Sequence, residues 1–244
     1  MKPYLEEITA LLSKIEREEA DAMARAAEAV AEVIAGDGIV HTFGCGHSHL
    51  PCLDTFYRAG GLACVSPMLD EDLMLHDGAA KSSRLEKTSG IAAEVFRRHS
   101  VDPVKDLVVV LSASGKNAAP VEMLRAAKAA GVKTVAISSS AYRTHGAVLL
   151  DEADLPIDCH VPYGDAVIDI SAVQPSTFNL QPVLMGGLST YASLFILNSI
   201  LIEGARLALA RGATPPVYVS GNVEGGTAKN LALEARYFNR VKRL

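Results

Sequence analysis

Short apolar runs and longer stretches with an apolar period of 3.6 residues alternate along the 244-residue chain. Short runs bounded by glycine or polar residues are typical of buried strands, and the longer period is typical of helices. The pattern predicts strands at residues 38–43, 62–65, 107–111, 132–138 and 155–160. It predicts helices at residues 4–35, 50–59, 84–99, 121–130, from about 176 to 211, and 227–244, with irregular chain at 67–83 and 162–175.

Strands that alternate with helices indicate an α/β fold in three layers, α/β/α, around a mainly parallel five-stranded sheet. In the common doubly wound order 2-1-3-4-5, the flavodoxin-like or Rossmann-like arrangement, the first and third strands are neighbours at the switch point. We expect a single domain over residues 1–244. Its core spans about residues 30–160, with flanking helices at 1–35 and 176–244.

Composition narrows the class of protein. Hydrophobic residues make up 49% of the chain, and the net charge is −5, which indicates a globular protein and argues against nucleic-acid and anionic-membrane partners. The first residues lack the long apolar run of a signal peptide, and no segment is expected to span a bilayer. The four cysteines show no C-x-x-C spacing, so the expectation is a cytoplasmic protein with reduced thiols.

Residues 106–131 are the stretch around which the candidate chemistry is organised. The apolar run LVVVL leads into the loop SASGKNAAP, which carries Ser112, Ser114, Gly115 and Asn117, and then into a helix. Hydroxyl donors beside the N-terminus of a helix suit a phosphate monoester. The loop has neither the Gly-Lys-Ser/Thr end of a nucleotide-binding P-loop nor the G-x-G-x-x-G fingerprint. An ordinary serine-rich turn is the alternative.

A second loop of similar kind follows the first strand. It reads Gly44-Cys45-Gly46-His47-Ser48-His49, and its two glycines allow a tight turn and a close approach to a ligand. If the strand order is 2-1-3-4-5, this loop and the loop at Ser112 face each other over one crevice. The sequence therefore predicts one anion site shared by two serine loops.

These loops resemble the SIS (sugar isomerase) domain family of phosphosugar-binding proteins over about residues 30–160. The resemblance is carried by TFGCGHSH at 42–49, VVVLSASGKNAAP at 108–120 and VKTVAISSS at 132–140. Segments 73–87 and 220–230 are similar to a bacterial group of SIS proteins often labelled as phosphoheptose-isomerase-like.

The resemblance implies an SIS-type three-layer fold, a sugar-phosphate ligand, and a homodimer or homotetramer with sites near the subunit interfaces. Family members often have Ser or Thr where this chain has Asn117, and the metal-ligand pattern of true phosphoheptose isomerases is not matched. No cofactor or metal is expected. By motif match, the phosphosugar is expected to contact Gly44, Gly46, Ser48, Ser112, Ser114, Gly115 and Asn117.

An aldose–ketose phosphosugar isomerase needs a base to move a proton between C1 and C2 and an acid to polarise the carbonyl or open the ring. Glu86 is the first candidate base and Glu224 the second, and His76 is the candidate acid. Each has a simpler interpretation. Glu86 would be a charge in the first turn of a helix, Glu224 a solvated loop residue, and His76 an exposed loop residue.

Two other functions fit the same loops. One is a phosphosugar sensor without catalysis, and the other is a lyase that cleaves an ether from an amino-sugar phosphate. Cys45, His47 and His49, flanked by His41 and Cys52, have side chains that suit a transition metal. Their spacing matches no zinc finger, and the glycine turn explains the local sequence without a metal.

Overall fold

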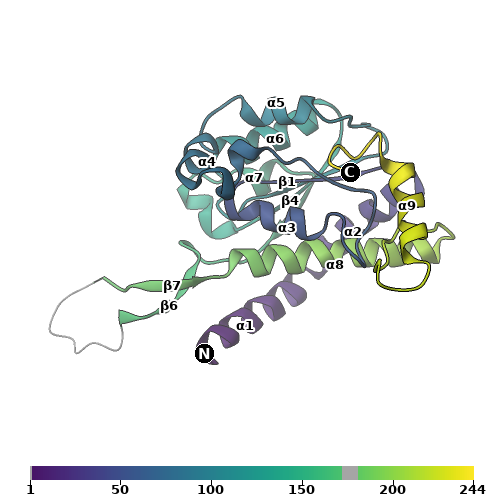
Figure 1. The fold of residues 1–244 in the computed structure, drawn as a ribbon. Helices are drawn as coiled ribbons and strands as arrows, with labels where there is room; N and C mark the ends of the chain where they lie inside the picture. The colour runs from purple at the N-terminus through teal and green to yellow at the C-terminus, as the bar shows by residue number, and fades with distance from the viewer. Residues whose placement is uncertain (1, 172–180) are drawn as a thin grey trace.

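Five parallel strands form the central sheet of the protein, and the computed structural model describes residues 2–171 and 181–244 (Figure 1). The strand order is β2-β1-β3-β4-β5, which confirms the predicted arrangement. Gly44 is aligned with Leu111 in the register of the first and third strands, so the loops after these strands begin side by side. The strands are β1 (Val40–Gly44), β2 (Val65–Pro67), β3 (Leu107–Leu111), β4 (Lys133–Ser138) and β5 (Leu155–Asp158).

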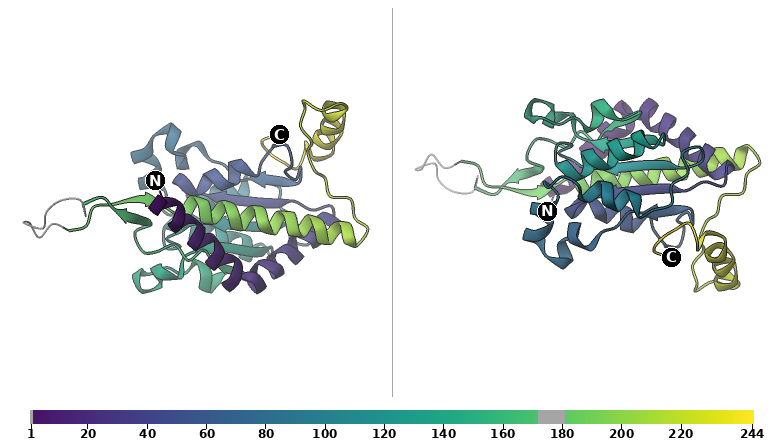
Figure 2. Two further views of the ribbon diagram at one scale, coloured as in Figure 1. Left: turned by 90° about the horizontal axis from the view of Figure 1, so that it is seen from below. Right: turned by 90° about the horizontal axis from the view of Figure 1, so that it is seen from above.

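Both faces of this sheet are covered by helices, which completes the three layers (Figure 2). One face carries α1 (Lys2–Glu18), α2 (Ala20–Ala35), α3 (His49–Asp54) and α8 (Ser189–Ala210). The other carries α4 (Ala79–Leu85), α5 (Ile91–Arg97), α6 (Ala118–Ala129) and α7 (Leu149–Glu152). Short 3-10 turns occur at Gly46–Ser48, Glu71–Leu73, Leu75–Asp77 and Ser140–His145.

The strand β3 has apolar residues at successive positions, without the alternation of a strand that is buried on one face. Leu107 and Val109 pack into the core beneath α2 and α8, and Val108 and Val110 pack into the separate core beneath α5 and α6. Because this parallel strand is buried on both faces, all five of its positions are apolar.

The N-terminal helix predicted at 4–35 is two helices, which corrects the prediction. The chain breaks at Glu19, between α1 and α2. The Glu19 carboxylate accepts hydrogen bonds from His160 Nε2 at 2.9 Å and from the Asp158 N–H at 3.2 Å, at the end of β5. A tertiary contact therefore bends a segment whose apolar period continues through the break.

The helix predicted at 84–99 is also wrong in its bounds. Residues 79–83 are helical although they were expected to be irregular, the first helix ends at Leu85, and α5 begins only at Ile91. Gly90 separates the two helices with φ of 99°, a left-handed conformation that glycine adopts without strain. The helix expected at 50–59 ends early as well, at Asp54.

Two strands, β6 (Ala166–Asp169) and β7 (Leu184–Gly187), pair antiparallel and project from the body of the molecule (Figure 1). The strand β6 lies in a stretch that was predicted to be irregular, and β7 lies in the early part of the helix predicted from about 176 to 211. The predicted start of that helix falls outside the described residues. Gly186 has φ of 85°, which no α-helix accommodates, so α8 begins only at Ser189.

The C-terminal segment packs beside the amino end of β1. Its helix α9 (Gly226–Tyr237) is shorter than the predicted 227–244. Arg236 and Arg240 both reach Asp37, with the Arg236 Nη2 lying 2.6 Å from Asp37 Oδ1. The segment is thus tied to the edge of the sheet opposite the serine loops.

The helix α8 is long and apolar enough to cross a bilayer by length and composition, contrary to the expectation for this chain. Its mean hydropathy reaches 1.5. In the fold, however, Ile196 and Ile200 are buried in the core, and α8 passes close to α2. A side chain at Gly204 would collide with Val30, so this glycine allows the close approach. Packing in the core accounts for the buried apolar residues of α8.

Candidate functional site

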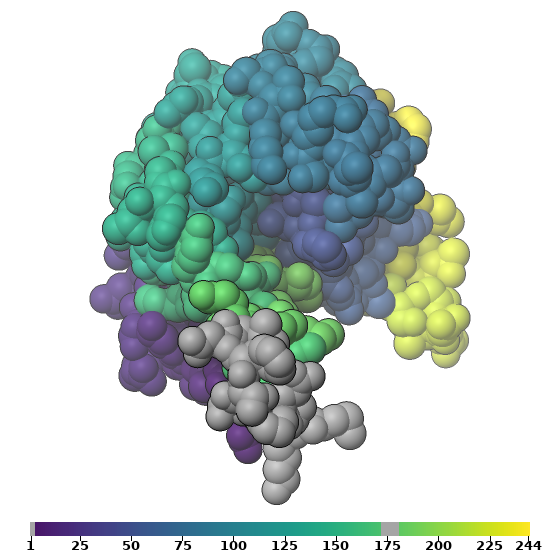
Figure 3. Space-filling model, turned by 90° about the vertical axis from the view of Figure 1, so that its left-hand side faces the viewer, coloured from purple at the N-terminus to yellow at the C-terminus, as the bar shows by residue number. Residues whose placement is uncertain are grey.

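A pocket of about 340 Å³ opens at the carboxyl edge of the sheet. Figure 3 faces this side, where the segments around residues 50, 80, 115 and 165 meet the start of α8. The wall comes from loops after β1, β3, β4 and β5, from α4, and from the start of α8. Its polar residues are His47, Ser48, Ser82, Ser83, Glu86, Ser112, Ser114, Asn117, Tyr142, Asp165 and Ser189. Doubly wound sheets bind ligands at this edge.

The loop after β1 is shaped by its glycines. A side chain at Gly44 would collide with the backbone carbonyl of Ser48, and Gly46 has φ of 55°. This tight turn brings Gly46 and Ser48 into the wall of the pocket. Gly44 does not line the pocket and contributes by allowing the turn. Cys45 also lines the pocket, but burial raises the pKa of its thiol well above the ordinary value, so it is a poor nucleophile.

The loop after β3 makes the neighbouring part of the wall. The Ser112 hydroxyl accepts a hydrogen bond from the Gly115 N–H at 3.2 Å, which closes the turn. Gly115 has φ of 57°, and a side chain there would collide with the Ser138 hydroxyl and approach Leu149. Gly115 therefore shapes the loop from behind, while Ser112, Ser114 and Asn117 line the pocket.

The N-terminus of α6 adds backbone donors. Among the residues that the structure describes, the N–H groups of Ser114, Lys116, Asn117 and Ala118 have no hydrogen-bond acceptor. The helix is 12 residues long, and its dipole places positive charge at this end. These groups are suited to an anion, because a helix start with open N–H groups attracts negative charge.

Glu86 lies in the same pocket, half-buried, at the C-terminal end of α4. It is not in the first turn of a helix, so that alternative interpretation of Glu86 is wrong. Asn117 Nδ2 donates to Glu86 Oε1 at 3.0 Å, and the Ala119 N–H donates to the Glu86 carbonyl at 2.9 Å. The end of α4 is thereby fastened to the start of α6, and the carboxylate is held beside the serine loops.

The other two candidates for catalysis lie outside the residues that line the pocket. His76 is exposed, with its ring 6.0 Å from the ring of His49. Glu224 is exposed in the turn before α9, in the segment at the amino end of the sheet. His47, proposed from the sequence only as a metal ligand, is exposed on the pocket wall.

The metal interpretation involves Cys45, His47 and His49. His49 is buried, its Nδ1 is hydrogen-bonded to the Gly46 carbonyl, and burial lowers its pKa below 6.5. Within residues 2–171 and 181–244, no group of three or more His, Cys, Asp or Glu side chains is arranged to hold a metal ion.

Sequence reasoning did not select Tyr142, Asp165 and Ser189 for the site. Asp165 Oδ1 accepts hydrogen bonds from the backbone N–H groups of Leu188 at 2.7 Å and Ser189 at 2.8 Å, and Oδ2 accepts from the Ser189 hydroxyl at 2.7 Å. The available signal was position, because Tyr142 and Asp165 follow the fourth and fifth strands and chemistry collects at the ends of parallel strands.

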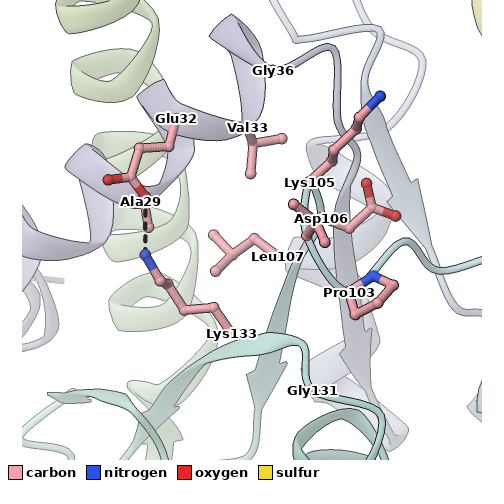
Figure 4. A pocket seen from close by; sticks show the side chains of 11 residues that line it. Ala29, Glu32, Val33, Gly36, Pro103, Lys105, Asp106, Leu107, Gly131 and Lys133 are labelled. Carbon is pink, nitrogen blue, oxygen red and sulfur yellow. Dashed lines mark hydrogen bonds and ion pairs between the residues drawn. The ribbon is translucent and has the colours of Figure 1, made fainter.

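Another pocket, of about 370 Å³, lies at the amino edge of the sheet (Figure 4). It is bounded by α2 and by the starts of β3 and β4, and an ion pair of 2.9 Å joins Glu32 and Lys133 across it. None of the candidate residues from the two serine loops lines it, because those loops follow the opposite ends of the strands.

Comparison with known proteins adds to this geometry. A family model of the SIS domain matches residues 3–139. The chain belongs to the SIS domain family. It is 38% identical over 249 residues to a UPF0309 protein of Caldanaerobacter subterraneus, covering 99% of this chain and 98% of that protein. It is likewise 38% identical over 245 residues to a UPF0309 protein of Listeria monocytogenes, covering 98% and 96%.

Solved structures share the fold of this SIS domain protein. Phosphoheptose isomerase GmhA from Neisseria gonorrhoeae matches with a TM-score of 0.52 and 16% identity, over 84% of this chain and 95% of that one. The Vibrio vulnificus NanR protein complexed with ManNAc-6P matches with a TM-score of 0.52 and 12% identity, over 98% and 68%. At such low identity these matches bear on the fold alone.

Proposed function

We propose that this SIS domain protein is an aldose–ketose phosphosugar isomerase whose substrate binds in the pocket at the carboxyl edge of the sheet. The observation that carries the proposal is the position of Glu86. This carboxylate, held by Asn117, lines the same pocket as Ser48, Ser112 and Ser114. An anion site and a base in one pocket are the two parts that the reaction requires.

The phosphate would bind at the loop after β3. Ser112 and Ser114 supply hydroxyls, Ser48 supplies a third from the loop after β1, and the start of α6 supplies open N–H groups. Neutral donors directed at one point, together with a helix dipole, stabilise a phosphate dianion without a lysine or arginine.

Glu86 would act as the base. It would take the proton from C2 of the open-chain aldose while the acid gives a proton to O1, which leaves an enediol. It would then return the C2 proton to C1 while the C2 hydroxyl gives its proton back to the acid, which yields the ketose. Asn117 keeps the carboxylate in position for both transfers. We propose His47 rather than His76 as the acid that assists at the carbonyl oxygen, because His47 lines the pocket.

The test is a coupled assay across aldose and ketose phosphates with the wild-type protein and Glu86→Gln. Glutamine keeps the size of the side chain but cannot accept the proton, so we expect turnover to fall roughly 10²- to 10⁴-fold while binding persists. Glu7→Gln, an exposed position on α1, is the matched control and should keep full activity. Full activity in Glu86→Gln would remove Glu86 from the role.

A phosphosugar-binding module without catalysis is the second candidate. It is supported by the structural match to the NanR protein complexed with ManNAc-6P. In that case sugar phosphates would raise the melting temperature of the protein, yet no member of the panel would be converted. Solvent deuterium appearing at C1 or C2 of a bound sugar would exclude this candidate, because only proton transfer introduces it.

A further inference from the structure

The wall of the pocket that includes Asp165 and Ser189 has no role in the proposed proton transfer. We infer that Asp165 recognises the sugar end of the ligand, selecting monophosphates with a hydroxyl or amino group there and rejecting those with a second anionic group. This inference rests on the proposed sugar-phosphate site and adds a substrate class to it.

The Asp165 carboxylate is held firmly in place. Two backbone N–H groups, of Leu188 and Ser189, donate to Oδ1, and the Ser189 hydroxyl donates to Oδ2. Asp165 itself has φ of 68°, an uncommon conformation for a residue other than glycine. Gly187 makes room for it, since a side chain there would place its Cβ 2.9 Å from Oδ2. The surrounding chain therefore specifies where these two oxygens lie.

The carboxylate also retains capacity for a ligand. Its two oxygens offer about four acceptor positions, and three are used within the protein. The free position is on Oδ2, and Asp165 is a lining residue of the pocket. An ionised carboxylate accepts hydrogen bonds and cannot donate them. It therefore favours a hydroxyl or an ammonium group and repels a carboxylate or a second phosphate.

The N-terminus of α8, which is 22 residues long, would by itself attract an anion. Asp165 already supplies that negative charge, because it binds the N–H groups of Leu188 and Ser189. Two long helices begin at the pocket. The start of α6 keeps N–H groups without an acceptor, whereas the N–H groups of Leu188 and Ser189 at the start of α8 are bound by Asp165. The start of α8 at the pocket thus already carries a carboxylate, which disfavours a second anionic group of a bisphosphate or a phosphorylated sugar acid beside it.

The experiment compares three open-chain probes that share one phosphate, two of which each differ from glucitol 6-phosphate at a single carbon. Glucitol 6-phosphate carries a hydroxyl at C1, 6-phosphogluconate carries a carboxylate there, and 2-amino-2-deoxyglucitol 6-phosphate adds an amine at C2. None of them has the carbonyl that isomerisation needs, so calorimetric titration of the full chain measures binding without turnover.

For the wild type we expect the two alcohols to bind roughly 10-fold or more tightly than 6-phosphogluconate, because a carboxylate facing Asp165 loses a hydrogen bond to a charged group. Asp165→Asn should reduce this preference to about 2-fold or less, since the amide carries no charge and can donate. Asp21→Asn, at an exposed aspartate on α2 that does not line the pocket, is the matched control. It makes the same change of charge and should keep the preference.

Circular dichroism shows whether the variants fold. If Asp165→Asn does not fold, the ratio of the wild-type affinities for glucitol 6-phosphate and 6-phosphogluconate still tests the inference. Equal binding of 6-phosphogluconate and glucitol 6-phosphate by the wild type would overturn the role of Asp165 and leave the sugar-phosphate site intact. An unchanged preference in folded Asp165→Asn would do the same. If no sugar phosphate binds at all, the proposed function fails together with this inference.

Discussion

His99, which follows α5, should make the protein less stable as the pH falls from about 8 to about 5. Its Nδ1 donates to the Val95 carbonyl at 2.8 Å, and its Nε2 is buried without a hydrogen-bond partner among the described residues. Burial lowers its pKa from 6.5 to about 4, with a smaller contribution from His41, whose ring lies 6.5 Å away. The folded protein therefore keeps this imidazole neutral in a range where the unfolded chain protonates it.

The sign and size follow from that difference. Above the unfolded pKa of 6.5, His99 is neutral in both states and stability is unaffected. As the pH falls, the unfolded state binds the proton first, so the free energy of unfolding decreases until the folded pKa of about 4 is reached. At about pH 5 the loss is about 2 kcal/mol. Partial exposure of the ring reduces this to about 1 kcal/mol.

Urea denaturation at about pH 8, 6.5 and 5 measures the effect. His99→Gln cannot titrate and should lose about 1 kcal/mol less than the wild type over this range. His145→Gln, at an exposed histidine, is the control and should follow the wild type. Burial also lowers the pKa of His49, so some acid sensitivity should remain in His99→Gln.

The titration of Asp106 does not affect the stability measured between about pH 8 and pH 5. Burial opposes the shift, but hydrogen bonds from His41 and from the backbone N–H groups of Asp102 and Ile39 hold the pKa of Asp106 below 3.8. The stability that it contributes is present above 3.8 and is lost only below that pH. If the wild type and His99→Gln lose the same free energy between about pH 8 and pH 5, the reasoning about His99 is refuted.

Two further predictions concern the loops and the thiols. Gly44→Ala should abolish sugar-phosphate binding and lower the free energy of unfolding by roughly 1–3 kcal/mol, because the new methyl group collides with the Ser48 carbonyl. Calorimetric titration measures the binding, and urea denaturation measures the stability. Unaltered binding would contradict the role of Gly44. All four cysteines are buried, and burial raises the pKa of Cys52, Cys64 and Cys159 to about 12. Iodoacetamide at about pH 8 should therefore label none of them in the folded protein and all four in urea, as read by mass spectrometry, and rapid labelling of the native protein would show the burial to be wrong.

The sequence by itself determined the sheet and the two serine loops. Apolar runs such as 107–111 are readable because strands buried on both faces are rich in apolar residues, and Gly44 and Gly115 are readable because only glycine suits their turns. Right-handed connections between parallel strands then restrict the topology, so the order 2-1-3-4-5 could be predicted.

Only the tertiary structure decided which side chains from other segments join the serine loops in the pocket and where the helices break. Glu86 meets Asn117 across 31 positions of sequence, and Asp165 meets Ser189 across 24, through contacts that no local pattern records. The break at Glu19 depends on His160, far along the chain, while the helical period of the sequence runs through it. Local periodicity reports which face of a segment is buried, and it carries no information about what that face is buried against.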